Sequence, residues 1–105
     1  MAVDLTVSAN KRARGEVLAL MYSVQPMPVE IRTITNALLE SNVVSVPDIA
    51  RHVDYLVGKG YITVINEEDA EKVLRGVVPP SSFVKLTPKG IDLVEQTIED
   101  PGVDV

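Results

Sequence analysis

The stretch that most constrains the fold of this chain is residues 45–64, which reads SVPDIARHVDYLVGKGYITV. Ile49, Val53 and Leu56 recur at the spacing of one helical face, so the segment predicts an amphipathic helix. Gly60 then supplies the residue type that most readily takes a left-handed conformation at a helix end. The four residues after it, YITV, favour a β-strand. We therefore predict a helix that ends at a glycine and passes directly into a strand.

The start of this helix is also marked in the sequence. Ser45 suits the N-cap, because its hydroxyl can accept a hydrogen bond from a free N–H of the first turn. Pro47 suits that turn, where a missing N–H costs no hydrogen bond. A preceding helix is expected at about residues 28–40, with residues 41–44 as the connecting turn, so the two helices form a helix-turn-helix unit.

The remaining elements follow from the spacing of apolar, turn-forming and helix-capping residues. Residues 1–8 alternate apolar and polar positions, and we expect either a frayed arm or a short edge strand. Residues 67–75 are expected to form either a short helix or a mobile acidic loop. The other expected elements are a helix at about 10–24, strands at 61–65 and 83–86, and a last helix that is capped by Thr87, has Pro88 in its first turn and fades near residue 100.

Length and composition indicate one domain with an aliphatic core. The chain has 105 residues, of which 46% are hydrophobic and only 4% aromatic. It has no cysteine, which excludes disulfides and thiolate metal sites. No apolar run approaches the roughly 18 residues that cross a bilayer, and no secretory signal is recognisable, so we expect a cytoplasmic protein.

The net charge of −5 is distributed unevenly along the chain. Residues 1–60 carry six basic and six acidic side chains, whereas residues 61–105 carry four basic and nine acidic ones. An acidic balance weighs against a generic nucleic-acid binder, because the phosphate backbone repels negative charge. The half that contains the helix-turn-helix unit is nevertheless neutral.

Two local motifs, in this order and separation, resemble those of the winged helix-turn-helix superfamily. The first, IxxxVxxLxxxGYI at residues 49–62, is similar to the junction between recognition helix and wing strand in many bacterial and phage transcriptional regulators. The second, LTxxG at residues 86–90, is similar to the segment that ends the wing and starts the last helix in multiple-antibiotic-resistance-type regulators. Together the matching elements cover roughly residues 15–98.

The resemblance implies an α+β, mostly α, fold with a three-helix core, a two-stranded wing and a C-terminal helix. The expected organisation is an N-terminal arm at residues 1–9, a winged-helix domain at residues 10–99 and a flexible tail at residues 100–105. The wing departs from the family pattern, since DNA-binding wings usually present Arg or Lys at the tip. Here a long insertion presents four carboxylates instead, at Glu67, Glu68, Asp69 and Glu71.

The residues predicted to contact DNA on the recognition helix lie opposite its apolar face. Arg51 has the geometry to pair with a guanine. Tyr55 and Lys59 are suited to phosphate oxygens, and His52 lies at the edge of this face. The same face is equally compatible with a solvated surface on which Asp48 and Arg51 form an ion pair.

Two further segments supply candidate phosphate contacts. Thr33 and Asn36 are on the outward face of the helix at 28–40. Lys11, Arg12 and Arg14 are near the start of the first helix, a region from which winged-helix proteins often contact phosphates. The alternative interpretation of these three basic residues is a solvated helix start.

The sequence gives no support for catalysis, a metal ion or a cofactor. His52 is the single histidine, and with no cysteine it lacks the partners that transition metals require. The six glycines are scattered and form no phosphate-binding loop, and no nucleophile and base are suitably spaced. We therefore predict a non-catalytic protein.

Two functions from different classes remain. The first is a winged-helix transcriptional regulator of bacterial or phage origin that binds double-stranded DNA as a homodimer, with the last helix and the arm before residue 10 as dimer elements. The second is a winged-helix module that binds a protein partner through its acidic wing and does not bind DNA. The second hypothesis rests on the net charge of −5 and on the acidic insertion.

Overall fold

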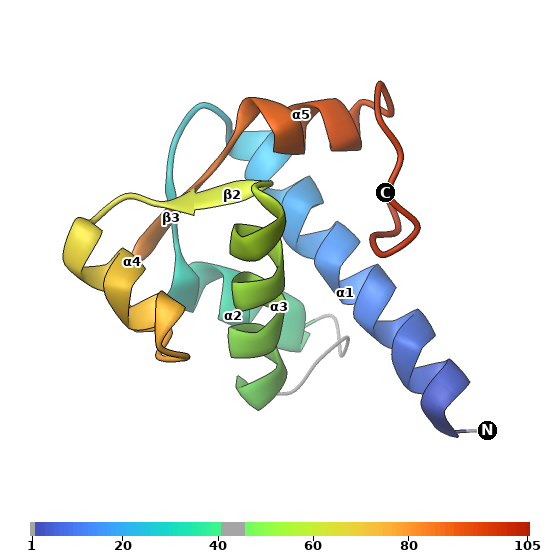
Figure 1. Cartoon of the computed structure of the whole chain (residues 1–105), viewed down its shortest axis with the longest axis horizontal. Coiled ribbons are helices and arrows are strands. Elements are labelled where there is room, and N and C mark those ends of the chain that lie inside the picture. Colours follow the sequence, from blue (N-terminus) through green and yellow to red (C-terminus); the bar gives the residue numbers. More distant parts are fainter. Residues whose placement is uncertain (1, 41–45) are drawn as a thin grey trace.

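The structure, a computed structural model, describes residues 2–40 and 46–105, and Figure 1 shows the arrangement of its elements. It agrees with the predicted α+β, mostly α, class, because helices surround one small antiparallel sheet. None of the helices in this part of the chain is long and apolar enough to cross a membrane. The elements in chain order are α1 (Ala2–Val24), β1 (Val29–Glu30), α2 (Ile31–Glu40), α3 (Val46–Lys59), β2 (Ile62–Val64), α4 (Glu67–Leu74), β3 (Phe83–Leu86) and α5 (Pro88–Val94).

The sheet has the strand order β1-β3-β2, and both pairings are antiparallel. The predicted pairing between the strands on either side of the acidic insertion is confirmed, with Ile62 opposite Leu86 and Val64 opposite Val84. Strand β1 was not expected, because two residues are too few to show a period of two. It forms where Val29 lies opposite Val84, on the other side of the central strand.

The core lies between the sheet and the helices, and it is aliphatic as the composition predicts. Val17 and Leu18 of α1 and Val53 and Leu56 of α3 are completely buried. Strand β3 alternates exposed and buried residues, so one face of the sheet meets this core and the other faces outward. Helix α3 packs against α1, α2 and β2.

The predicted end of α3 and the predicted start of α5 are both found in the structure. Gly60 follows α3 with a φ of +81°, the left-handed conformation that ends the helix. The hydroxyl of Thr87 accepts a hydrogen bond from the Gly90 N–H at 3.1 Å, which confirms the predicted cap of the last helix. A Cβ added at Gly90 would overlap the carbonyl of Tyr61, so this glycine allows α5 to approach the residue just before β2 closely.

The acidic insertion contains a helix, the first of the two alternatives predicted for it. Asn66 caps α4, and its side-chain oxygen accepts hydrogen bonds from the N–H groups of Glu68 at 2.8 Å and Asp69 at 3.3 Å. The carboxylates in the first turn stabilise the helix, because their negative charge lies beside the positive end of the helix dipole. Gly76 follows the helix with a φ of +86°.

Several predicted boundaries are wrong at the ends of elements. Residues 2–8 belong to α1 and form neither a frayed arm nor an edge strand. The segment contains no proline or glycine, so an established helix extends through it by adding one hydrogen bond per residue. Helix α5 ends at Val94, earlier than predicted, and Gln96 follows with a φ of +62°. The predicted N-cap Ser45 and the predicted turn at 41–44 lie outside the described residues.

Candidate functional site

Residues 100–104, here called the C-terminal segment, pack against α1 and α3 and do not form the predicted flexible tail (Figure 1). Val103 is buried, with 4% of its surface exposed. The backbone N–H of Asp104 donates to the carbonyl oxygen of Lys11 at 3.0 Å. A buried aliphatic side chain and a backbone hydrogen bond to α1 fix the end of the chain, which its polar composition did not predict.

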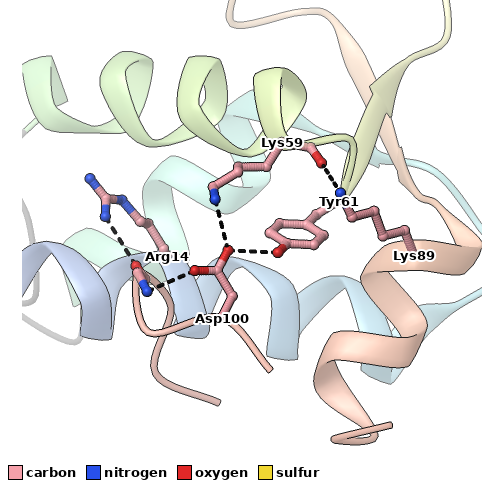
Figure 2. A network of polar contacts seen from close by, with 6 residues as sticks. Arg14, Lys59, Tyr61, Lys89 and Asp100 are labelled. Carbon is pink, nitrogen blue, oxygen red and sulfur yellow. Dashed lines mark hydrogen bonds and ion pairs between the residues drawn. The ribbon is translucent and has the colours of Figure 1, made fainter. Parts of the chain in front are cut away.

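Figure 2 shows the polar contacts that hold this segment, and two of the predicted phosphate-binding side chains take part. Arg14 Nη1 donates to the carbonyl oxygen of Gly102 at 3.0 Å. Lys59 Nζ lies 3.3 Å from Asp100 Oδ2, and the Tyr61 hydroxyl donates to the same oxygen at 2.6 Å. The other oxygen of Asp100 accepts from the Gly102 N–H at 2.8 Å. Arg14 and Lys59 are thus paired within the chain.

The Asp100 carboxylate and the Tyr61 phenol perturb each other. Burial, followed by the hydrogen bond and the charge of Asp100, raises the pKa of Tyr61 to about 12. The hydrogen bond from Tyr61 is the largest cause that lowers the pKa of Asp100 below its usual value, and burial opposes this shift. At neutral pH the pair is therefore a carboxylate that accepts from a neutral phenol, with Lys59 balancing the charge.

Tyr55, a third predicted contact, lies close to the same two cations. The Arg14 guanidinium lies 3.7 Å from the centre of its ring and the Lys59 ammonium 5.8 Å from it. A Cβ added at Gly102 would overlap the Tyr55 hydroxyl, so the C-terminal segment also approaches this side chain closely. Tyr55 is half-buried, and its ring supports the Arg14 side chain.

Gly15 of α1 makes the close approach of the C-terminal segment possible. A Cβ added there would overlap the backbone carbonyl of Asp104. Any other residue at this position would force α1 and the C-terminal segment apart. The C-terminal segment contacts the side chains of Arg14, Tyr55, Lys59 and Tyr61, and we call the surface that they form the α1–α3 face.

His52 lies inside the molecule and not at the edge of an outward face. It is 2% exposed, and neither ring nitrogen has a hydrogen-bond partner among the described residues. Burial, followed by the positive charges of Arg14 and Arg51, lowers the pKa of His52 to about 4. His52 is therefore a neutral core residue at pH 7, which places it out of reach of DNA.

The other five predicted contact residues remain at the surface. Arg51 has 73% of its side chain exposed, and it forms the ion pair with Asp48 that the sequence suggested as an alternative. The remaining four are the exposed Arg12, Thr33 and Asn36 and the half-buried Lys11. The structure does not bring these residues together into one site through any contact that it records.

The start of α2 is occupied by the segment that follows α4. The N–H groups of Ile31 and Arg32 donate to the carbonyl oxygens of Ser82 at 2.8 Å and Pro80 at 2.9 Å. Free N–H groups at a helix N-terminus are a common phosphate-binding element. At α2 two of these donors are already used within the chain.

A hollow of about 280 Å³ lies between α2, α3 and this same segment, and we call it the α2–α3 groove. It is lined by Ile31, Arg32, Thr35, Ile49, Ala50, Val78 and Pro80. Two aliphatic residues that precede Val78 in the chain are exposed: Leu74, at 83%, and Val77, at 55%. The sequence analysis did not predict this apolar surface. It assigned residues 67–75 to a short helix or a mobile loop and predicted no groove beside them.

The side chains that complete the α1–α3 face were also missed. Asp100, Gly102 and Val103 were assigned to a tail, although the sequence DPGV contains a turn-forming pair followed by an aliphatic residue. Tyr61 was read as a strand residue only. Local sequence patterns do not reveal the contact between Asp100 and Tyr61, because these residues are 39 positions apart in the chain.

No group of histidine, cysteine or acidic residues suited to holding a metal ion occurs in the part of the chain that the structure describes. Comparison with known proteins adds no relative. No protein-family model matches this chain, and neither a curated protein nor a solved structure matches it.

Proposed function

We propose that this chain is a winged helix-turn-helix domain. The order of α1, β1, α2, α3, β2 and β3, with the sheet order β1-β3-β2, supports this proposal. The passage from α3 through Gly60 into β2 supports the assignment of α3 as the helix in the recognition position. In this domain α4 replaces the tip of the wing, and the chain after it returns over the start of α2.

We propose that the domain is a non-catalytic module that binds a protein and does not read DNA. The observation that carries this proposal is that three of the five cations predicted to face DNA are paired within the chain. Arg14 and Lys59 are engaged by the C-terminal segment, and Arg51 is engaged by Asp48. A cation that already has an anionic or carbonyl partner gains little from a phosphate, because its internal contact must first be broken.

The charge distribution supports the same conclusion. The first turn of α4 carries Glu67, Glu68 and Asp69, and the net charge of the chain is −5. A wing with this charge would be repelled by a duplex lying against α3. The exposed apolar side chains near α4 are instead suited to contact with the surface of another protein.

A mobility-shift series with random duplex DNA tests this proposal. We expect no retarded band at about 50 mM or about 200 mM salt, since non-specific binding needs unpaired cations. Arg51→Ala serves as the matched variant, and it should behave like the wild type. A salt-dependent shift that is lost in Arg51→Ala would overturn the interaction-module proposal.

The exposure of Arg51 favours a second candidate function, a DNA-binding transcriptional regulator that acts as a homodimer. Its side chain is 73% exposed and its partner Asp48 is a surface carboxylate, so the ion pair is a weak one. Selection of a duplex from a random pool would identify an operator. Under this function Arg51→Ala should relax the preference at one position by about 1–3 kcal/mol.

A further inference from the structure

Two complementary apolar features lie close together in the chain beside α4. One is the α2–α3 groove, whose lining includes Val78 and Pro80. The other is Leu74, which has the largest exposed fraction among the large hydrophobic side chains that the structure describes. In Figure 1, α4 lies on the opposite side of α3 from α1 and the C-terminal segment.

We infer that two copies of this chain associate about a two-fold axis, with Leu74 of each copy inserted into the α2–α3 groove of the other. The inference rests on the proposed interaction function and names the partner as a second copy. A two-fold interface requires one surface to carry both the projecting residue and its receptor. Here Leu74 precedes the lining residue Val78 by only four positions.

The groove has the size and chemistry to receive an aliphatic side chain. Its volume of about 280 Å³ equals that of roughly nine water molecules, so the four-carbon side chain of Leu74 fits within it. Among the lining residues, the side chains of Ile31, Ile49 and Ala50 have no polar atom that could hydrogen-bond to water. Such a surface gains stability when an apolar group displaces its water.

Charged residues at the two features are complementary as well. Arg32 lines the groove and is exposed over 58% of its side chain, and it lies 3.8 Å from Glu30, near the limit for an ion pair. Glu71 is exposed on α4 and lies one turn before Leu74. When Leu74 enters the groove of the second copy, Glu71 approaches Arg32 of that copy. The pair occurs twice across the two-fold axis and fixes the orientation of the copies.

Sedimentation velocity of the full chain, from low micromolar concentration to about 1 mM, measures the association. We expect a concentration-dependent dimer for the wild type. Leu74→Asp should raise the dimer dissociation constant at least tenfold, since removing water from a carboxylate in the mostly apolar groove costs more than an ion pair with Arg32 returns. Met27→Asp is the matched control, because Met27 is also exposed, at 67%, but is not among the residues that line the groove.

Charge reversal tests the predicted pairing directly. Arg32→Glu and Glu71→Arg should each weaken the dimer, because each places like charges opposite each other. The chain that carries both substitutions restores opposite charges at both contacts, and it should regain most of the lost affinity. A merely structural role for either residue would not produce this rescue.

Three results would overturn the inference: a wild type that stays monomeric throughout the concentration range, a dimer that Leu74→Asp leaves unchanged, or a double variant with no rescue. Each leaves the result of the DNA mobility-shift series untouched, so the two proposals fail separately. A monomer that binds no DNA removes this inference alone. A dimer that retains random duplex DNA through Arg51 removes the proposed function instead.

Discussion

Helix α3 has two sides that differ in how their surfaces are satisfied. On the α1–α3 face, the C-terminal segment covers the helix, and Arg14, Lys59 and Tyr61 all have partners within the chain. On the α2–α3 groove, apolar side chains line a hollow that the described residues leave open, and Leu74 projects beside it. The closed face carries two of the cations that were expected to bind DNA, Arg14 and Lys59, whereas the open groove offers an apolar surface that a protein could contact.

The difference indicates which side of α3 contributes to the stability of the single chain and which contributes to association. A closed face with buried hydrogen bonds contributes to the free energy of unfolding, because removing one partner leaves another polar group unsatisfied. An open apolar groove contributes little to the stability of a single chain and more to association. Substitutions on the two sides should therefore separate into effects on stability and effects on assembly.

The largest effect is expected from Gly15→Leu on the closed face. The new side chain would overlap the Asp104 backbone and expel the C-terminal segment, so that Val103 becomes exposed. We expect the free energy of unfolding to fall by about 3–5 kcal/mol, from the lost burial and the lost hydrogen bonds. Urea denaturation followed by circular dichroism measures this change.

Gly58→Ala is the matched control for that substitution. A Cβ added at Gly58 meets no atom within 4 Å, and the residue lies inside α3. We expect an increase in stability of about 0.5–1 kcal/mol, because alanine loses less backbone entropy in a helix. Equal losses in Gly15→Leu and Gly58→Ala would contradict the close approach of the C-terminal segment.

How far the sequence predicted the two sides can be stated from particular residues. The end of α3 at Gly60 and the cap at Thr87 are local, since each depends on a few neighbouring residues, and both are confirmed. The pairing of Arg14 with Gly102 spans 88 positions, and no periodicity in the sequence reports such a contact. The two-residue strand β1 likewise forms only because the central strand lies beside it.

The candidate site was less predictable than the fold for a related reason. Helical periodicity placed His52 at the edge of the outward face, yet in the folded chain this side chain is buried. Arg14 and Lys59 were assigned to phosphates because their charge is visible in the sequence, whereas their internal partners are distant along the chain. Charge patterns identify which residues can bind an anion, and only tertiary contacts decide which anion or carbonyl they meet.

A second effect should be seen when acid protonates His52. Its pKa is about 4 in the folded chain and about 6.5 when it is unfolded, so the unfolded state binds the proton first as the pH falls. Stability should therefore be complete above pH 6.5 and decrease by up to about 3 kcal/mol between pH 6.5 and pH 4. Denaturant titrations at several pH values measure this slope.

His52→Gln isolates this contribution from that of the carboxylates. Glutamine is neutral throughout the range, so the difference between the two proteins should shrink steadily as the pH falls from 6.5 to 4. Parallel curves for the two proteins would show that His52 is accessible to protons in the folded chain. Arg14 and Arg51 remain charged in both proteins.

A smaller effect is expected when the acceptor of the Tyr61 hydroxyl is removed. Asp100→Ala leaves the phenol buried without its partner and frees Lys59, so we expect a loss of about 1–3 kcal/mol. The pKa of Tyr61 should move down from about 12, and it should stay above its usual value because burial remains. Ultraviolet difference titration of the phenol reports this shift.

Lys59→Ala provides the comparison for that loss. The Lys59 side chain is 43% exposed, whereas that of Asp100 is only 8% exposed, so water replaces the ammonium more readily than the carboxylate. The cost should be below about 1 kcal/mol. A larger loss in Lys59→Ala than in Asp100→Ala would mean that the ion pair, and not the phenol, holds the C-terminal segment.

The smallest effect on the stability of a single chain is expected from Leu74→Ala in the open region. Leu74 is 83% exposed, so its truncation removes little buried surface and should change the free energy of unfolding by less than about 0.5 kcal/mol in dilute solution. Val103→Ala removes two methyl groups from a side chain that is 4% exposed, and it should cost more under the same conditions. At high protein concentration the wild type gains stability from association, so Leu74→Ala should then melt at a lower temperature than the wild type. A melting temperature that is independent of concentration in both proteins would place Leu74 outside any interface.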